Sequence, residues 1–138
     1  MRVILDTNVV VSGLFFGGAP RRILELWREG ALHWVITAQI LDEYRRVGSV
    51  LGKRYLGVNA DPFLDFVARR ATVVTPKKLP KPATADPDDE KFFEAAVGGD
   101  VRLIVSGDKH LLNAAGSFRV QVLKSADFLE QRMWDDGK

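Results

Sequence analysis

The chain has 138 residues, of which 46% are hydrophobic and 28% charged, and its formal net charge is +2. This length supports one hydrophobic core, so we expect a single domain over residues 1–138. The sequence contains no cysteine, which excludes disulfides, thiolate nucleophiles and cysteine-ligated zinc. No apolar stretch approaches the roughly 20 residues of a membrane helix, and we recognise no secretory signal. We therefore expect a cytoplasmic protein with no membrane partner.

Five short apolar runs, rich in β-branched residues, predict strands. The last of them is followed by a helix that starts near Ser125. Because helical patterns alternate with the strands, the sequence predicts an α/β fold with a mostly parallel central sheet of about five strands, flanked by helices. The predicted strands cover residues 3–5, 33–37, 71–75, 101–105 and 120–123, and the predicted helices 21–29, 38–47, 61–70 and 91–97.

Helix start and stop signals support these boundaries. Asp61 and Asp86 each precede a proline, as an N-cap residue does before the first helical position. Gly98 and Gly99 are expected to end the helix over residues 91–97. The proline-rich stretch at 76–82 is the most irregular connector.

A carboxylate directly follows the first predicted strand. Asp6 comes after Val-Ile-Leu, and a charge at the end of a buried strand must be neutralised or used. Asp108 follows the fourth strand after a short turn. Open α/β sheets bind ligands at the carboxyl ends of their strands, so both acids are expected at the ligand-binding edge.

Two further acids are placed by helical periodicity. Glu43 lies three residues after Ile40 and shares the apolar side of its helix. Asp89 lies three and four residues before Phe92 and Phe93, at a helix start that would face the same edge. Carboxylates gathered in this way repel one another unless a cation compensates them, and oxygen ligands favour Mg²⁺ or Mn²⁺.

Each acid also has a structural interpretation. Asp86 is well explained as an N-cap, although it is an alternative to Asp89 as the third ligand. Asp88 and Glu90 suit the first turn of a helix, where the dipole favours acids. Asp108 could cap the short turn that follows it, and Glu43 could pair with a neighbouring arginine.

The basic residues and the aromatic residues allow more than one interpretation. Five basic pairs either face solvent or form a surface for phosphates. Tryptophan and phenylalanine are expected in the core, with Leu14, Phe15 and Phe16 as a candidate partner surface or dimer contact. The basic pairs are at residues 21–22, 45–46, 53–54, 69–70 and 77–78.

Four motifs in order resemble the PIN-domain family of ribonucleases over essentially the whole chain, and more narrowly the VapC-like toxins of prokaryotic toxin–antitoxin systems. The motifs are Asp6-Thr7-Asn8-Val9, Glu43 within residues 41–47, Asp86-Pro87-Asp88-Asp89 leading to Ala95-Ala96, and Ser106-Gly107-Asp108-Lys109. Any one of them is weak, but four together are specific.

The resemblance implies a metal-dependent endoribonuclease that uses Mg²⁺ or Mn²⁺ to hydrolyse RNA phosphodiesters. Its implied catalytic and metal-binding residues are Asp6, Glu43, Asp89 and Asp108, with Asn8 and Ser106 in support. The implied partners are RNA, a small antitoxin protein and a second copy of the chain.

Two other functions are weighed against this one. An aspartyl-phosphate phosphatase would use Asp6 as phosphoryl acceptor, but that chemistry favours a second aspartate at position 8, which is Asn8. A non-catalytic RNA- or protein-binding module would retain the acids for structure alone.

Overall fold

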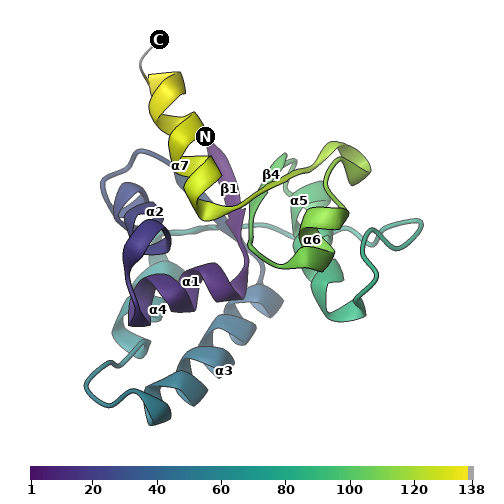
Figure 1. Cartoon of the computed structure of the whole chain (residues 1–138). Helices are drawn as coiled ribbons and strands as arrows, with labels where there is room; N and C mark the ends of the chain where they lie inside the picture. Colours follow the sequence, from purple (N-terminus) through teal and green to yellow (C-terminus); the bar gives the residue numbers. More distant parts are fainter. Residues whose placement is uncertain (137–138) are drawn as a thin grey trace.

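The five predicted strands form one sheet in a computed structural model of the chain, which describes residues 1–136. Their order is β3-β2-β1-β4-β5, and each of the four pairings is parallel. Figure 1 shows the paired strands β1 and β4 among the surrounding helices. The predicted α/β fold is confirmed. Residues 137 and 138 of the predicted domain lie outside the described residues. The strands are β1 (Arg2–Leu5), β2 (His33–Ile36), β3 (Thr72–Val73), β4 (Leu103–Val105) and β5 (Gln121–Leu123).

Seven α-helices flank the sheet in the part of the chain that the structure describes. None of these helices is long and apolar enough to cross a membrane. They are α1 (Thr7–Phe15), α2 (Gly18–Arg28), α3 (Ala38–Arg54), α4 (Asp61–Arg70), α5 (Glu90–Gly98), α6 (Lys109–Asn113) and α7 (Ser125–Asp136).

Strand β1 lies at the centre of the core. Its residues Val3, Ile4 and Leu5 are all 0% exposed. Successive side chains of a strand point to opposite faces of the sheet, so helices must cover both faces here. This explains why the predicted strand reads as a continuous apolar run rather than an alternating one.

Helix α1 was not predicted from the sequence. Its first half contains Val9, Val10 and Val11, which favour strands, and it follows β1 with only Asp6 between them. All three valines are buried, and a Cβ on Gly13 would lie 2.7 Å from Leu24 Cδ1 of α2. Close packing on α2 therefore overrides the local preference.

The boundaries of the predicted helices agree with the structure to within a turn except at the end of α3, and the N-cap of α4 differs by one position. Asp61 is the first helical residue of α4 rather than its N-cap, and its backbone N–H donates to Asn59 Oδ1 at 3.0 Å. Helix α3 continues to Arg54, beyond the predicted end at residue 47. Its N-cap is Thr37, whose side chain accepts from the backbone N–H of Ile40.

The strand order places a topological switch point between β1 and β4. From β1 the chain continues to β2 and β3 on one side, whereas β4 and β5 lie on the other. The backbone N–H of Asp6 donates to Val105 O at 3.0 Å, which extends the pairing past the end of β1. Ligands of open α/β sheets bind at this position, so the fold brings the segments after β1 and β4 together there.

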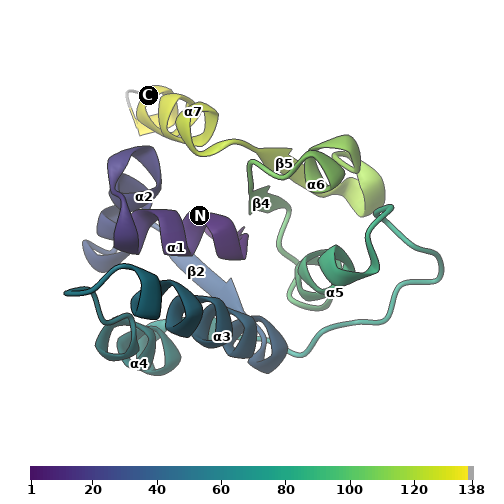
Figure 2. The ribbon, with the colours of Figure 1, turned by 60° about the horizontal axis from the view of Figure 1, so that its bottom comes forward.

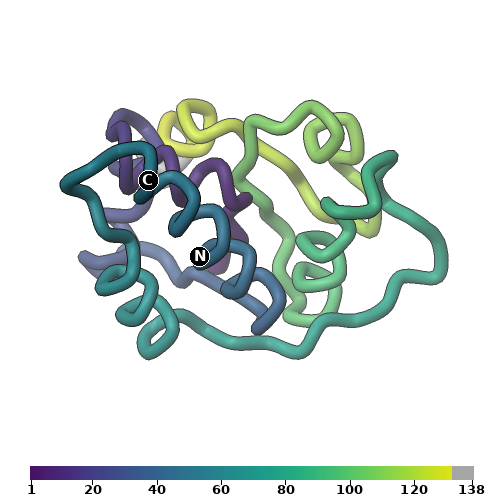
Figure 3. Tube along the Cα trace, turned by 90° about the horizontal axis from the view of Figure 1, so that it is seen from below, coloured from purple at the N-terminus to yellow at the C-terminus, as the bar shows by residue number. Residues whose placement is uncertain are grey.

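The connector from β3 to α5 packs its backbone against α5. It runs along one side of the molecule between the α4 and α5 segments (Figure 3). A Cβ on Gly98 would lie 2.1 Å from Thr75 O and 2.8 Å from Lys77 N. Gly98 is the last residue of α5, as predicted, but the close approach of this connector also explains its lack of a side chain.

We expect Gly98→Ala to lower the free energy of unfolding by about 2 kcal/mol, because the added methyl group collides with backbone that cannot move independently. An ordinary helix would gain stability from the same change. Urea denaturation measures the difference. Gly107→Ala is the matched control, since a Cβ there meets nothing within 4 Å. Equal stability of the two variants would contradict the packing account.

Candidate functional site

Asp6 is held rigidly at the carboxyl end of β1. It is 5% exposed, and Ser106 Oγ donates to its Oδ2 at 2.7 Å. Burial raises the pKa of the Asp6 carboxyl, and repulsion from Asp108 and Glu43 raises it further. The hydrogen bonds from Ser106 and from the backbone N–H of Thr7 oppose this shift. The protein thus holds Asp6 in one orientation without fully compensating its charge.

Ser106 links the two strand-end acids. Its Oγ, which donates to Asp6, accepts from the backbone N–H of Asp108 at 2.9 Å. Asp108 Oδ1 in turn caps α6 by accepting from His110 N at 2.7 Å and Leu111 N at 3.2 Å. The capping interpretation of Asp108 is therefore confirmed. Its carboxylate still lies close enough to Asp6 to raise the pKa of that residue.

Glu43 carries an ion pair inside the site. Its side chain is 18% exposed, and its Oε1 lies 2.8 Å from Lys91 Nζ and 3.7 Å from an Arg46 guanidinium nitrogen. The hydroxyl of Thr7 donates to Glu43 Oε2. Pairing with an arginine is confirmed, but the shorter contact is to a lysine that the sequence did not single out. Glu43 is thus oriented by residues of α1 and α5.

Asp89 has the least satisfied carboxylate of the group. It is the N-cap of α5 by position but makes no capping hydrogen bond, and its buried Oδ2 has no hydrogen-bond partner. Burial raises the pKa of Asp89 to about 6, with additional repulsion from Asp108, Asp6 and Asp86. Lys91 opposes the shift. Buried polar atoms normally have hydrogen-bond partners, so this carboxylate oxygen can accept from a donor or bind a cation.

The neighbouring acids have structural roles. Asp86 Oδ1 accepts from the backbone N–H of Asp88 at 3.0 Å and caps the 3₁₀ turn Pro87–Asp89, so its predicted capping role is confirmed. Glu90 Oε1 accepts from the backbone N–H groups of Ala83 and Thr84. The geometry favours Asp89 over Asp86 as an available ligand, and the choice stays a prediction.

The sequence did not predict every residue that contacts the acids, and Asn8 does not lie where the resemblance implied. Asn8 is exposed on the first turn of α1, and within residues 1–136 it makes no hydrogen bond to Asp6. Thr7 and Lys91, which the sequence did not single out, orient Glu43. Tyr44 is buried and donates to Leu5 O at 2.5 Å, which fixes α3 to the end of β1. Four acids predicted in one site carry negative charge that a nearby cation would compensate, and this could have indicated a residue such as Lys91.

The donor chemistry fits a hard divalent cation. Carboxylate oxygens are the ligands that Mg²⁺ and Mn²⁺ prefer, and the unpartnered Asp89 Oδ2 is such an oxygen. The described residues nonetheless contain no group of three His, Cys, Asp or Glu side chains placed to hold a metal ion. Coordination of one ion by three of these carboxylates would therefore require some of them to reorient.

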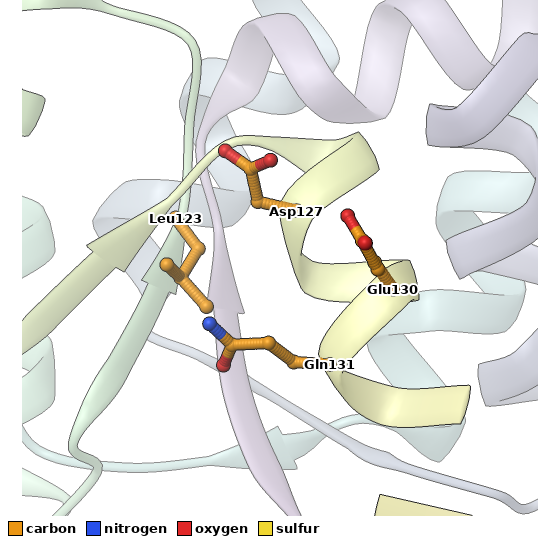
Figure 4. A pocket seen from close by; sticks show the side chains of 4 residues that line it. All are labelled: Leu123, Asp127, Glu130 and Gln131. Atoms are coloured by element: carbon orange, nitrogen blue, oxygen red, sulfur yellow. The ribbon is translucent and has the colours of Figure 1, made fainter. Parts of the chain in front are cut away.

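Two pockets differ in their relation to this site. One of about 400 Å³ opens beside it, between α3 and the start of α5, and its lining includes Glu43, Arg46 and Lys91. Another of about 420 Å³ lies between β5 and α7, where Leu123 and Gln131 lie close together while Asp127 and Glu130 project from the helix (Figure 4). The second pocket contains none of the predicted site residues.

The fold and the site define a class of protein: an α/β domain that gathers carboxylates at the switch point of a parallel sheet. The model of the PIN-domain family matches residues 2–110, so the chain belongs to the PIN-domain family. A PIN domain generally implies metal-dependent nuclease activity. The matched range includes Asp6, Glu43, Asp89 and Asp108. No curated protein matches the chain.

We expect Lys91→Met to lower the free energy of unfolding by about 2 kcal/mol at pH 7, because it leaves Glu43 partly buried without its nearest cation. Arg46→Met is the matched control: its side chain is 71% exposed, so its loss should cost less than about 1 kcal/mol. Urea denaturation of both variants checks this. Equal losses would contradict a specific role for Lys91.

Proposed function

We propose that the protein is an endoribonuclease that hydrolyses RNA phosphodiesters with Mg²⁺ or Mn²⁺. The observation that carries the proposal is the buried, unpartnered Oδ2 of Asp89 beside Asp6 and Asp108. Burial raises the pKa of Asp6 and of Asp89, and repulsion from neighbouring carboxylates raises both further, a repulsion that a bound cation would relieve. Membership of the PIN-domain family supports the same chemistry.

Asp6, Asp89 and Asp108 would hold the cation, and Glu43 would complete the set. When bound, the ion would lower the pKa of a water and neutralise charge that develops on the phosphate. Ser106 fixes the orientation of Asp6 and the position of the Asp108 backbone. Thr7 and Lys91 fix Glu43. Arg46, in the adjoining pocket, offers a cation for a phosphate of the substrate.

We further propose that the chain is a cytoplasmic, VapC-like toxin that forms a homodimer and is neutralised by a small antitoxin protein. This narrower assignment is supported by the resemblance of the four motifs alone. A genomic neighbour encoding a small protein that binds this chain would test it independently of catalysis.

A non-catalytic binding module is the second candidate. The observation in its favour is the Lys91–Glu43 ion pair at 2.8 Å, which already compensates one of the four acids. Such a protein would bind RNA or a protein partner without cleaving the RNA. The unsatisfied Asp89 oxygen argues against it, because a purely structural site would be expected to pair that group.

We expect the protein to cleave a long structured RNA with Mg²⁺ or Mn²⁺, and EDTA to abolish the cleavage. Asp6→Asn should lower the rate at least about 100-fold, since it removes a charge from the proposed ligand set. Gel electrophoresis of labelled RNA measures both effects.

Asp127→Asn, which removes an acid of the separate α7 pocket, is the matched control and should cleave normally. Cleavage that persists in EDTA and in Asp6→Asn would refute the proposal. RNA binding without cleavage would support the binding module.

A further inference from the structure

Three aromatic side chains gather where α1 and α3 end. Phe15 is the last residue of α1, and Phe16 and Tyr55 are the C-caps of α1 and α3. Tyr55 lies edge-on to Phe16, with ring centroids 5.1 Å apart, and 6.2 Å from Phe15. Phe16 is 61% exposed and Tyr55 39% exposed, unlike the buried phenylalanines of the core. We call Phe15, Phe16 and Tyr55 the aromatic patch.

Basic side chains without ionic partners adjoin the aromatic patch. Arg21 donates to the carbonyl oxygens of Gly13 and Leu14 at the end of α1, and Lys53 and Arg54 directly precede Tyr55. In the described part of the chain, none of these three cations forms an ion pair. Other arginines of the basic pairs do so: Arg22 with Glu25 and Glu29, Arg45 with Asp65, and Arg46 with Glu43. The aromatic patch therefore has cations available for an anionic ligand.

The aromatic patch and the acidic site lie at opposite ends of helices α1 and α3. Helices α1 and α3 lie side by side (Figure 2), and both begin beside that site, α1 directly after Asp6 and α3 with Glu43 in its second turn. Twelve residues of α3 and its C-cap separate Glu43 from Tyr55, which is roughly 18 Å at 1.5 Å per residue. Arg46, Val50 and Lys53 are exposed within this stretch.

We propose that the aromatic patch binds the single-stranded part of the RNA substrate on one side of the scissile phosphate, with a base stacked on Phe16 and Tyr55. This inference rests on the proposed function, and it gives the RNA substrate a second region of contact besides the acidic site. Exposed rings provide stacking surfaces for any base, and the unpaired cations bind the flanking phosphates. A protein partner would use the exposed apolar area but would not require the unpaired cations beside it.

The test is a comparison of two ligands in EDTA, where no cleavage occurs: fluorescein-labelled decauridine and a labelled decamer of the same sugar-phosphate backbone without bases. Fluorescence anisotropy gives the dissociation constants. The wild-type protein should bind decauridine about tenfold more tightly than the abasic decamer. Phe16→Ala should lose most of this preference, whereas Lys53→Gln should weaken binding to both ligands alike.

Val73→Ala and Lys124→Gln are the matched controls. Both residues are exposed and lie outside the aromatic patch, Val73 on β3 and Lys124 directly after β5. They should bind as the wild type does, and thermal melting should show all four variants folded. If Phe16→Ala keeps the full preference for decauridine, or if it changes only self-association in sedimentation, the proposal is wrong. Because binding is measured without cleavage, this result is independent of whether the wild type cleaves RNA.

Discussion

The burial of a carboxylate at the end of β1 is the constraint on which the rest of the structure depends. Asp6 is 5% exposed and follows three residues that are wholly buried, so its charge cannot be solvated by water alone. The parallel pairing of β1 with β4 places the segment that follows β4 directly beside Asp6. Ser106 then donates to Asp6 and accepts from the backbone of Asp108. The hydroxyl group of Ser106 therefore connects the two acids that follow the paired strands β1 and β4.

The helices supply the other contacts but leave the site incompletely compensated. Thr7 of α1 and Lys91 of α5 both bind Glu43, which ties two helices to α3. Tyr44 fixes α3 to the backbone of Leu5. Asp89 receives no such contact at Oδ2, and its pKa rises to about 6. Three of the four acids thus have hydrogen-bond or ionic partners, whereas Asp89 keeps one oxygen without a partner among the described residues.

The sequence predicted the sheet and the position of the acids well, because both depend on local signals. Apolar runs marked all five strands, Asp6 follows the first of them directly, and Asp108 follows the fourth after Ser106 and Gly107. Helix α1 was missed because its valines favour a strand, and only packing against α2 makes them helical. Lys91 was missed because its burial depends on Glu43, 48 positions earlier in the sequence. Contacts across the fold leave no periodic signal.

The most direct test of the account is calorimetric titration with Mn²⁺ at pH 6, in two buffers with different ionisation enthalpies. Burial raises the pKa of Asp89 to about 6, so part of the protein should carry a proton on Asp89 at that pH. Mn²⁺ binding should therefore release protons, and Asp89→Asn should bind Mn²⁺ more weakly and release fewer protons. Failure of Mn²⁺ to bind, or binding that is unchanged in Asp89→Asn with no proton release, would contradict the claim that these carboxylates form a cation site.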